Sequence, residues 1–161
     1  MLQLVKTVLQ SFGVGTVITA IDGEEAFHKF CDTNPDLVIT DWMMTPVNGI
    51  ELSNKIRREK DSPNPYVPIL LMTGFSETTR VLEARDEGIT ELMVKPFNTR
   101  DLYRRLHRII EQPRQFVRSN DFFGPDRRRK QTVSIYTGKQ KRRSDLSSES
   151  MVISAADVDL K

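Results

Sequence analysis

The sequence alternates strictly between short apolar stretches and longer amphipathic stretches, and the links between them are short. The apolar stretches are rich in β-branched residues, and they predict four buried strands, at residues 16–20, 36–40, 67–72 and 91–94. The amphipathic stretches predict five helices, at residues 2–12, 22–32, 48–58, 76–87 and 98–111. This alternation predicts an α/β fold with a doubly wound parallel sheet.

Three chemically reactive side chains follow the last three predicted strands. Asp41, Thr73 and Lys95 each come directly after one of these strands. Because ligands of doubly wound sheets bind beyond the carboxyl ends of the strands, we expect the three side chains to share one edge of the sheet. A carboxylate can attack phosphorus, and a hydroxyl and an ammonium group can stabilise the charge of a phosphoryl group. The three residues therefore predict a phosphoryl-accepting site with Asp41 as the nucleophile.

Each of these residues, taken alone, also has a structural explanation. An Asp after a strand is usually a turn or cap residue, a Thr is common there, and a Lys-Pro pair is unremarkable. The hypothesis depends on their joint occurrence and on two neighbours. Gly74 leaves room for an incoming group, and Pro96 fixes the backbone after the lysine, as a cis peptide bond could. Trp42 is expected to be partly exposed beside the site.

Three segments carry a resemblance to a known family: PDLVITDWMMTPVNGIEL, PILLMTG and ELMVKPFNTRDL. In order and separation they resemble the receiver domain of two-component response regulators, and chemotaxis-type single-domain regulators are the nearest match. The resemblance covers residue 1 to about residue 112, and it implies a flavodoxin-like fold with strand order 2-1-3-4-5. It implies that Asp41 accepts a phosphoryl group from a histidine kinase or phosphotransfer protein, with Thr73 and Lys95 in contact with the phosphoryl oxygens.

The resemblance also implies a magnesium site and a switch. Mg²⁺ would be held by Asp41, by the backbone carbonyl of Met43 and by a pair of acidic residues at the end of the family's first strand. Gly74, Pro96 and Leu92 occupy loop and switch positions. Leu92 stands where the family commonly has an aromatic switch residue, so we expect signalling output by a route other than rotation of an aromatic ring.

The family's first strand and its acidic pair have no counterpart in this sequence. The chain begins inside what resembles the first helix, so strand 1 of the order 2-1-3-4-5 is missing. Asp22, Glu24 and Glu25 are better explained as charges at the start of a helix. We therefore expect either a longer natural chain, in which Met1 is internal, or a degenerate receiver, and the intact phosphoryl-site residues favour the longer chain.

The composition changes after Gln112 and Pro113, and we place a domain boundary there. Residues 1–112 carry 13 Lys or Arg against 16 Asp or Glu, whereas residues 113–161 carry 11 against 6. Regular apolar patterning also gives way to Arg, Ser, Gln and Gly. The sequence thus predicts an N-terminally truncated receiver domain at 1–112 and a basic, largely disordered tail at 113–161.

The tail contains one motif twice, an aromatic residue, a glycine and three basic residues, at an offset of 14 residues. Two interpretations stay open. The segment is either a solvated tail or a docking element for an anion, such as a nucleic-acid backbone, a phosphorylated nucleotide or an acidic protein face. In the second interpretation the anion-binding residues are Arg127, Arg128, Arg129, Lys141, Arg142 and Arg143.

The single cysteine and the hydropathy limit where the chain can function. Cys31 has no second cysteine to pair with, so we expect a reducing compartment, the cytoplasm. No apolar stretch approaches the roughly 18 residues that a membrane span requires.

We predict a response regulator of two-component signal transduction, not an enzyme, in which phosphorylated Asp41 switches the binding of an output protein. The alternative is a phosphorylation-independent pseudo-receiver scaffold whose Arg-rich tail binds an anionic partner. A phosphatase with Asp41 as a transient nucleophile is disfavoured. Haloacid-dehalogenase-like enzymes place a second Asp two residues further on, and this chain has Met43 there.

Overall fold

A parallel three-stranded sheet forms the centre of the molecule. The computed structural model describes residues 2–74, 84, 86–119, 122–126 and 151–153. The strands are β1 (Val38–Asp41), β2 (Ile69–Thr73) and β3 (Glu91–Val94), and they lie in the order β1-β2-β3. The central strand β2 pairs in parallel with both β1 and β3.

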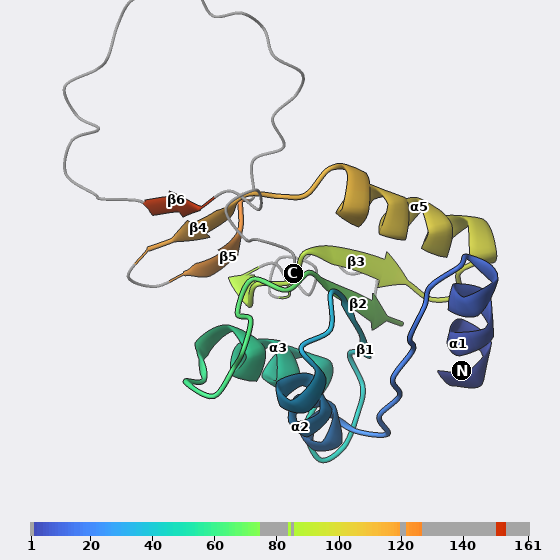
Figure 1. The fold of residues 1–161 in the computed structure, drawn as a ribbon, viewed down its shortest axis with the longest axis horizontal. Helices are drawn as coiled ribbons and strands as arrows, with labels where there is room; N and C mark the ends of the chain where they lie inside the picture. The colour runs from blue at the N-terminus through green and yellow to red at the C-terminus, as the bar shows by residue number, and fades with distance from the viewer. Residues whose placement is uncertain (1, 75–83, 85, 120–121, 127–150, 154–161) are drawn as a thin grey trace, which may run out of the picture.

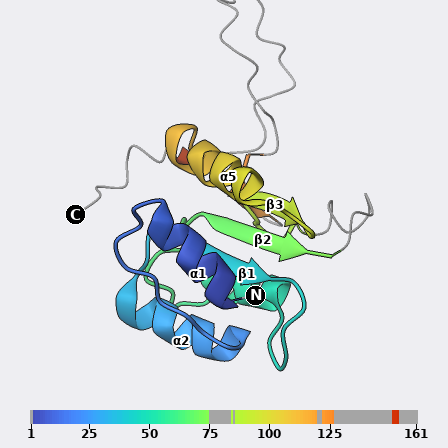
Figure 2. The ribbon, with the colours of Figure 1, turned by 90° about the vertical axis from the view of Figure 1, so that its right-hand side faces the viewer.

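Within the described ranges, four helices cover the two faces of this sheet. They are α1 (Leu2–Ser11), α2 (Gly23–Thr33), α3 (Gly49–Arg58) and α5 (Thr99–Glu111). Figure 1 shows α5 and the pair α2–α3 on opposite sides of the three central arrows, and in Figure 2 α1 lies in front of β1. Helices on both faces of a parallel sheet confirm the predicted doubly wound α/β fold. The helix predicted at 76–87 lies mostly outside the described residues.

Alternate side chains of β2 divide the core into two halves. Ile69 and Leu71 pack with residues of α2 and α3, whereas Leu70 and Met72 pack with residues of α1 and α5. This division follows from the period of two along a strand, which points successive side chains to opposite faces. A continuous apolar strand is therefore what a sheet with two covered faces requires.

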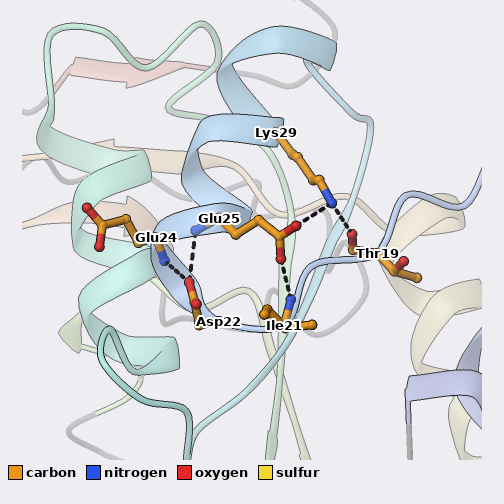
Figure 3. A network of polar contacts seen from close by, with 6 residues as sticks. All are labelled: Thr19, Ile21, Asp22, Glu24, Glu25 and Lys29. Atoms are coloured by element: carbon orange, nitrogen blue, oxygen red, sulfur yellow. Dashed lines mark hydrogen bonds and ion pairs between the residues drawn. The ribbon is translucent and has the colours of Figure 1, made fainter.

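The helix starts follow the capping residues that the sequence contains. Asp22 Oδ1 accepts hydrogen bonds from two backbone amides of the first turn of α2, both at 2.9 Å (Figure 3). In the same network Glu25 accepts from Ile21 N and from Lys29 Nζ, each at 2.7 Å. The Lys29 hydrogen bond, followed by that from Ile21, lowers the pKa of the Glu25 carboxyl. Lys29 Nζ also donates to the carbonyl of Thr19 at 2.7 Å, which ties the incoming chain to α2.

The strand predicted at residues 16–20 was wrong. These residues form no strand, although they connect α1 to α2. A strand requires a hydrogen-bonded neighbour, and within the part of the chain that the structure describes β1 pairs with β2 alone. Residues 16–20 have no such neighbour among the described strands.

The residues after α5 form a second, antiparallel sheet. Its strands are β4 (Phe116–Arg118), β5 (Phe123–Pro125) and β6 (Met151–Ile153), in the order β5-β4-β6. This sheet lies beyond the C-terminal end of α5 in Figure 1. Strands at 116–118 and 123–125 show that the disordered tail expected from residue 113 does not begin there. The disorder predicted for residues 127–150 and 154–161 lies outside the described residues.

A buried arginine joins this second sheet to the α/β body. Arg57 of α3 is 5% exposed, and its guanidinium donates to the carbonyl of Gly88 at 3.0 and 3.1 Å and to that of Pro65 at 2.7 Å. The guanidinium carbon lies 5.1 Å from the centre of the Phe116 ring of β4, within the range of a cation–π contact. Burial lowers the pKa of Arg57 to about 9, so the group still carries its proton at neutral pH.

Aromatic rings and a close backbone contact complete the junction. Tyr66 packs edge-on against Phe116 and Phe123, at 5.5 and 5.2 Å between ring centroids. A Cβ added at Gly124 would lie 2.8 Å from the Cα of Gly88, so this approach of β5 to the body requires glycine. The second sheet is therefore packed on the body at the end where β2 and β3 begin.

We expect Arg57→Met to lower the free energy of unfolding by about 2–4 kcal/mol, because two buried carbonyls lose their donors at about 1–3 kcal/mol each. Arg58→Met is the matched control: its side chain is 59% exposed and lies 3.9 Å from Glu87, and such a surface pair contributes about 0–1 kcal/mol. Urea unfolding curves of both variants measure the difference. Equal losses for the two variants would contradict a structural role of Arg57.

Candidate phosphoryl-accepting site

Asp41, Thr73 and Lys95 come together at the carboxyl edge of the parallel sheet. Asp41 ends β1 opposite Met72, and Thr73 ends β2 opposite Val94 of β3. Lys95 follows Val94 directly, and its backbone N–H donates to the carbonyl of Thr73 at 2.7 Å. The arrangement follows from parallel pairing in register, which brings the ends of three strands to one edge.

The Asp41 carboxylate and the Lys95 ammonium group form an ion pair through Oδ2 and Nζ. The two side chains are 21% and 26% exposed, so water screens the pair less than it screens a surface pair. The second carboxylate oxygen, Oδ1, accepts a hydrogen bond from the backbone N–H of Met43 at 3.3 Å. This distance is longer than the usual 2.9–3.0 Å or so, and Oδ1 is therefore the more weakly held oxygen.

Thr73 differs from the other two residues in its burial. Its side chain is 1% exposed, whereas the Asp41 and Lys95 side chains are only partly buried. To contact a phosphoryl group on Asp41, the Thr73 hydroxyl would have to act from a buried position at the end of β2. The role of Thr73 in contacting phosphoryl oxygens stays a prediction.

The loop after Asp41 is closed by backbone hydrogen bonds. Trp42 N donates to the carbonyl of Met72 at 2.8 Å, and Gly49 N donates to the carbonyl of Trp42 at 3.1 Å. The expectation that Trp42 is partly exposed was wrong, because it is 7% exposed and packs in the core with α2 and α3. Met43 is the exposed residue beside the site, at 68%.

Gly49 lets the chain return close to the site. A Cβ at this position would lie 2.2 Å from the carbonyl oxygen of Asp41 and 2.9 Å from Leu71 Cδ1. No side chain fits at these distances. The start of α3 can therefore lie this close to Asp41 only if residue 49 is glycine. Asn48 caps the helix from the preceding position and forms a capping box with Glu51.

Of the three predicted loop and switch residues, Gly74 and Pro96 directly follow Thr73 and Lys95, and Leu92 lies within β3. Gly74 is exposed, and a Cβ there would meet nothing within 4 Å, which leaves open space after Thr73. The peptide bond between Lys95 and Pro96 is cis. Leu92 is half-buried and packs against the core on the α2–α3 side. Their part in switching stays a prediction.

The described residues do not assemble a metal site. They contain no group of three or more His, Cys, Asp or Glu side chains that could hold an ion. Mg²⁺ in proteins prefers near-octahedral oxygen ligands, including one or two carboxylates. At this edge Asp41 supplies a single carboxylate, which is already paired with Lys95, and the carbonyl of Met43 would be the second ligand. The acidic pair of the resemblance has no counterpart among the residues that the structure describes, so these residues do not fit the expected ion.

The predicted tail residues for anion binding cannot be placed. Arg127, Arg128, Arg129, Lys141, Arg142 and Arg143 all lie outside the described residues.

Sequence reasoning missed a cluster of arginines around a buried carboxylate. Glu91 begins β3, and its side chain is 4% exposed. It pairs with Arg105 at 2.8 Å and Arg114 at 3.1 Å, and Arg108 lies 3.8 Å away. The available signal was an acidic residue at the start of an otherwise apolar strand, followed by a helix unusually rich in arginine.

Comparison with known proteins agrees with this fold. The model of the response regulator receiver domain family matches residues 1–107. The chain belongs to this family. The chain is therefore a receiver of two-component signalling, as the quoted motifs predicted.

Individual relatives support the same assignment. The chemotaxis protein CheY-3 of Vibrio cholerae is 30% identical over 112 residues, which cover 70% of this chain and 85% of that protein. The probable transcriptional regulator ycf27 of Galdieria sulphuraria is 31% identical over 106 residues, or 66% of this chain. The receiver spans only 40% of the length of ycf27. The solved structure of CheY4 from Vibrio cholerae superposes on this chain with a TM-score of 0.61 at 33% sequence identity. The matched region covers 66% of this chain and 87% of the CheY4 chain.

None of the helices that the structure describes is long and apolar enough to cross a membrane.

We expect Gly49→Ala to destabilise the receiver by about 1–3 kcal/mol, the usual cost of forcing extra volume into a packed site. Gly15→Ala is the matched control, because a Cβ there meets nothing within 4 Å. Thermal unfolding followed by circular dichroism measures both. A Gly49→Ala variant as stable as Gly15→Ala would show that the loop after Asp41 is not held against α3.

We expect addition of Mg²⁺ to leave the fluorescence of Trp42 unchanged, since one lysine-paired carboxylate offers too few ligands for the ion. Trp42 is the only tryptophan and follows Asp41 directly, so its fluorescence reports on the surroundings of this residue. A saturable change that Asp41→Asn removes would prove a magnesium site.

Proposed function

We propose that this receiver accepts a phosphoryl group on Asp41 from a histidine kinase or phosphotransfer protein, and that phosphorylation switches the binding of an output protein. The observation that supports the proposal best is the contact of a partly exposed carboxylate with the Lys95 ammonium group at the carboxyl edge of the sheet. Carboxylates act as nucleophiles toward phosphorus in such positions, and a nearby cation stabilises the charge that gathers on the phosphoryl oxygens.

The transfer step uses the more weakly held oxygen of Asp41. Oδ1 attacks phosphorus, a new O–P bond forms, the P–N bond of a phosphohistidine breaks, and its electron pair leaves with the imidazole nitrogen. Oδ2 stays beside Lys95 at the start of the step. The ammonium group is then available to the transferred phosphoryl oxygens, and the Thr73 hydroxyl is the second donor at this edge.

The loop after Asp41 gives this chemistry a fixed geometry. Trp42 N donates to the carbonyl of Met72, and Gly49 N donates to that of Trp42. These two backbone hydrogen bonds fix the chain directly after Asp41. Burial of the Trp42 ring adds a side-chain anchor next to the nucleophile. Positioning of this kind is a large part of catalysis in phosphoryl transfer, because little covalent chemistry is left to the protein.

A phosphorylation-independent scaffold is the second candidate. The observation that favours it is the incomplete set of metal ligands among the described residues, since transfer to Asp41 would then lack a second cation beside Lys95. In this function the Asp41–Lys95 pair would serve only to hold β1 and β3 together at their ends.

We expect acetyl phosphate to add one phosphoryl group to the wild-type protein and none to Asp41→Asn, because the amide is no nucleophile. Intact-mass spectrometry measures the addition, and lability of the adduct in hydroxylamine identifies it as an acyl phosphate. Asp36→Asn is the matched control, since Asp36 is an exposed carboxylate just before β1. Equal labelling of wild type and Asp41→Asn, or no labelling of either, would support the scaffold instead.

A further inference from the structure

The outer side of α5 carries a row of arginines at regular spacing. Arg100, Arg104 and Arg108 follow one another at intervals of four residues, and four residues span about 6 Å of helix. Arg100 and Arg104 are exposed, and the Arg108 side chain is 41% exposed. The buried side of the helix is formed by Leu102, Leu106 and Ile109, so the row faces away from the core. We call these three residues the arginine row.

A second row of rings lies next to the first. Tyr103 is 49% exposed, and its ring lies 5.8 Å from the ring of His107, one turn further along α5. Across the boundary to α1, the ring of Phe12 contacts Tyr103 edge-on at 5.4 Å between centroids. At 100° per residue, Tyr103 and His107 stand on the side of the arginine row that faces α1. We call Phe12, Tyr103 and His107 the ring row.

Positive charge is in excess at the C-terminal half of this surface. Arg105, Arg108 and Arg114 all approach Glu91, at 2.8, 3.8 and 3.1 Å. One carboxylate can neutralise only one of three guanidinium groups, and their side chains remain 36%, 41% and 22% exposed. Arg118 of β4 is exposed beyond them.

The nearby acids do not cancel this excess. Asp101 belongs to the capping box at the start of α5, where it faces the backbone of Asn98. Glu111 is exposed at the other end of the helix. Together with Glu91, and with Asp126, whose backbone N–H donates to the carbonyl of Gln115 beside Arg114, these are four negative charges. The six positive charges are those of Arg100, Arg104, Arg105, Arg108, Arg114 and Arg118.

We propose that the outer face of α5 binds single-stranded nucleic acid, with the phosphate backbone along the arginine row and bases against the ring row. The arginine spacing of about 6 Å suits successive phosphates of an extended strand, and guanidinium groups match phosphate oxygens bidentately. Proteins that bind single strands without sequence preference combine a basic track with exposed rings on which bases stack. The arginine row, Tyr103 and His107 lie on α5, and Phe12 joins them from the end of α1.

Charge alone would serve an acidic protein segment as well as a phosphate backbone. The choice of nucleic acid therefore rests on the ring row beside the arginine row. In a single strand every base has a face that can stack, so Tyr103 beside Arg104 has a direct use. The surface does not include Asp41 or Lys95, so binding there does not use the residues of the phosphoryl-accepting site.

The test is a fluorescence-anisotropy titration of the full chain with a labelled oligothymidylate of about 12 nucleotides, within the usual site size of about 4–16. Arg104→Gln should weaken binding about fivefold at about 0.1 M salt, and it should reduce the slope of log K against log salt by about 0.7, the value of one phosphate contact. Tyr103→Leu should weaken binding about tenfold without changing that slope, because stacking carries no counterion term.

Arg58→Gln is the matched control, since it removes one exposed arginine from α3, which covers the other face of the sheet. It should leave both the affinity and the salt slope unchanged, and melting curves confirm that each variant is folded. Equal effects of Arg104→Gln and Arg58→Gln would overturn the proposal, because binding would then reflect charge anywhere on the chain. So would an unaffected Tyr103→Leu variant together with displacement of the oligonucleotide by polyglutamate at equal charge, which would assign the surface to an acidic protein.

Discussion

Burial of β2 between two parallel neighbours determines where every residue of the phosphoryl-accepting site lies. Ile69, Leu70 and Leu71 are 0% exposed, and a fully buried side chain of this kind contributes about 1.5–3 kcal/mol. A slip of one residue would turn these side chains to the wrong faces. The same slip would separate Asp41 from Lys95, which are joined only through the registers of β1, β2 and β3. The ion pair is therefore a consequence of apolar packing in the sheet, and its own contribution to stability is secondary.

Local signals in the sequence predicted most of the α/β body correctly. The helix starts at Asp22, Asn48 and Asn98 were recognised because a capping side chain bonds amides only two or three residues away. The bounds of β3 were predicted as the structure has them, since apolar residues there are followed at once by Lys-Pro. The meeting of three strand ends followed from topology alone.

Non-local contacts account for the errors. Residues 16–20 have the β-branched composition of a strand, but a strand exists only with a partner, and composition says nothing about the partner. Trp42 was expected to be exposed because it stands next to a reactive residue, yet the alternation after β1 turns its ring into the core. The second sheet was hidden by a polar composition, in which Phe116 and Phe123 find their partner Tyr66 some 50 residues earlier. Arg57 counts as a surface residue by type and becomes a core residue because carbonyls of two loops satisfy it.

β3 links the two charged regions of the molecule, because each end of this short strand holds one of them. Glu91 at its start binds arginines of α5 and of the segment that leads to β4, and Lys95 just after its end binds Asp41. The helix α5 starts four residues after Lys95 and returns along the strand, where its Arg105 binds Glu91.

A ligand on the outer face of α5 and a phosphoryl group on Asp41 would thus use different cations and would not compete directly. Coupling between the two sites would need an element with two arrangements that both ligands influence unequally. A strand of four residues with a buried ion pair at its start and apolar packing along its length is a poor candidate for such an element. Among the described residues the arrangement instead favours the two proposed sites acting in parallel, the first for the phosphoryl group and the second for a ligand on α5.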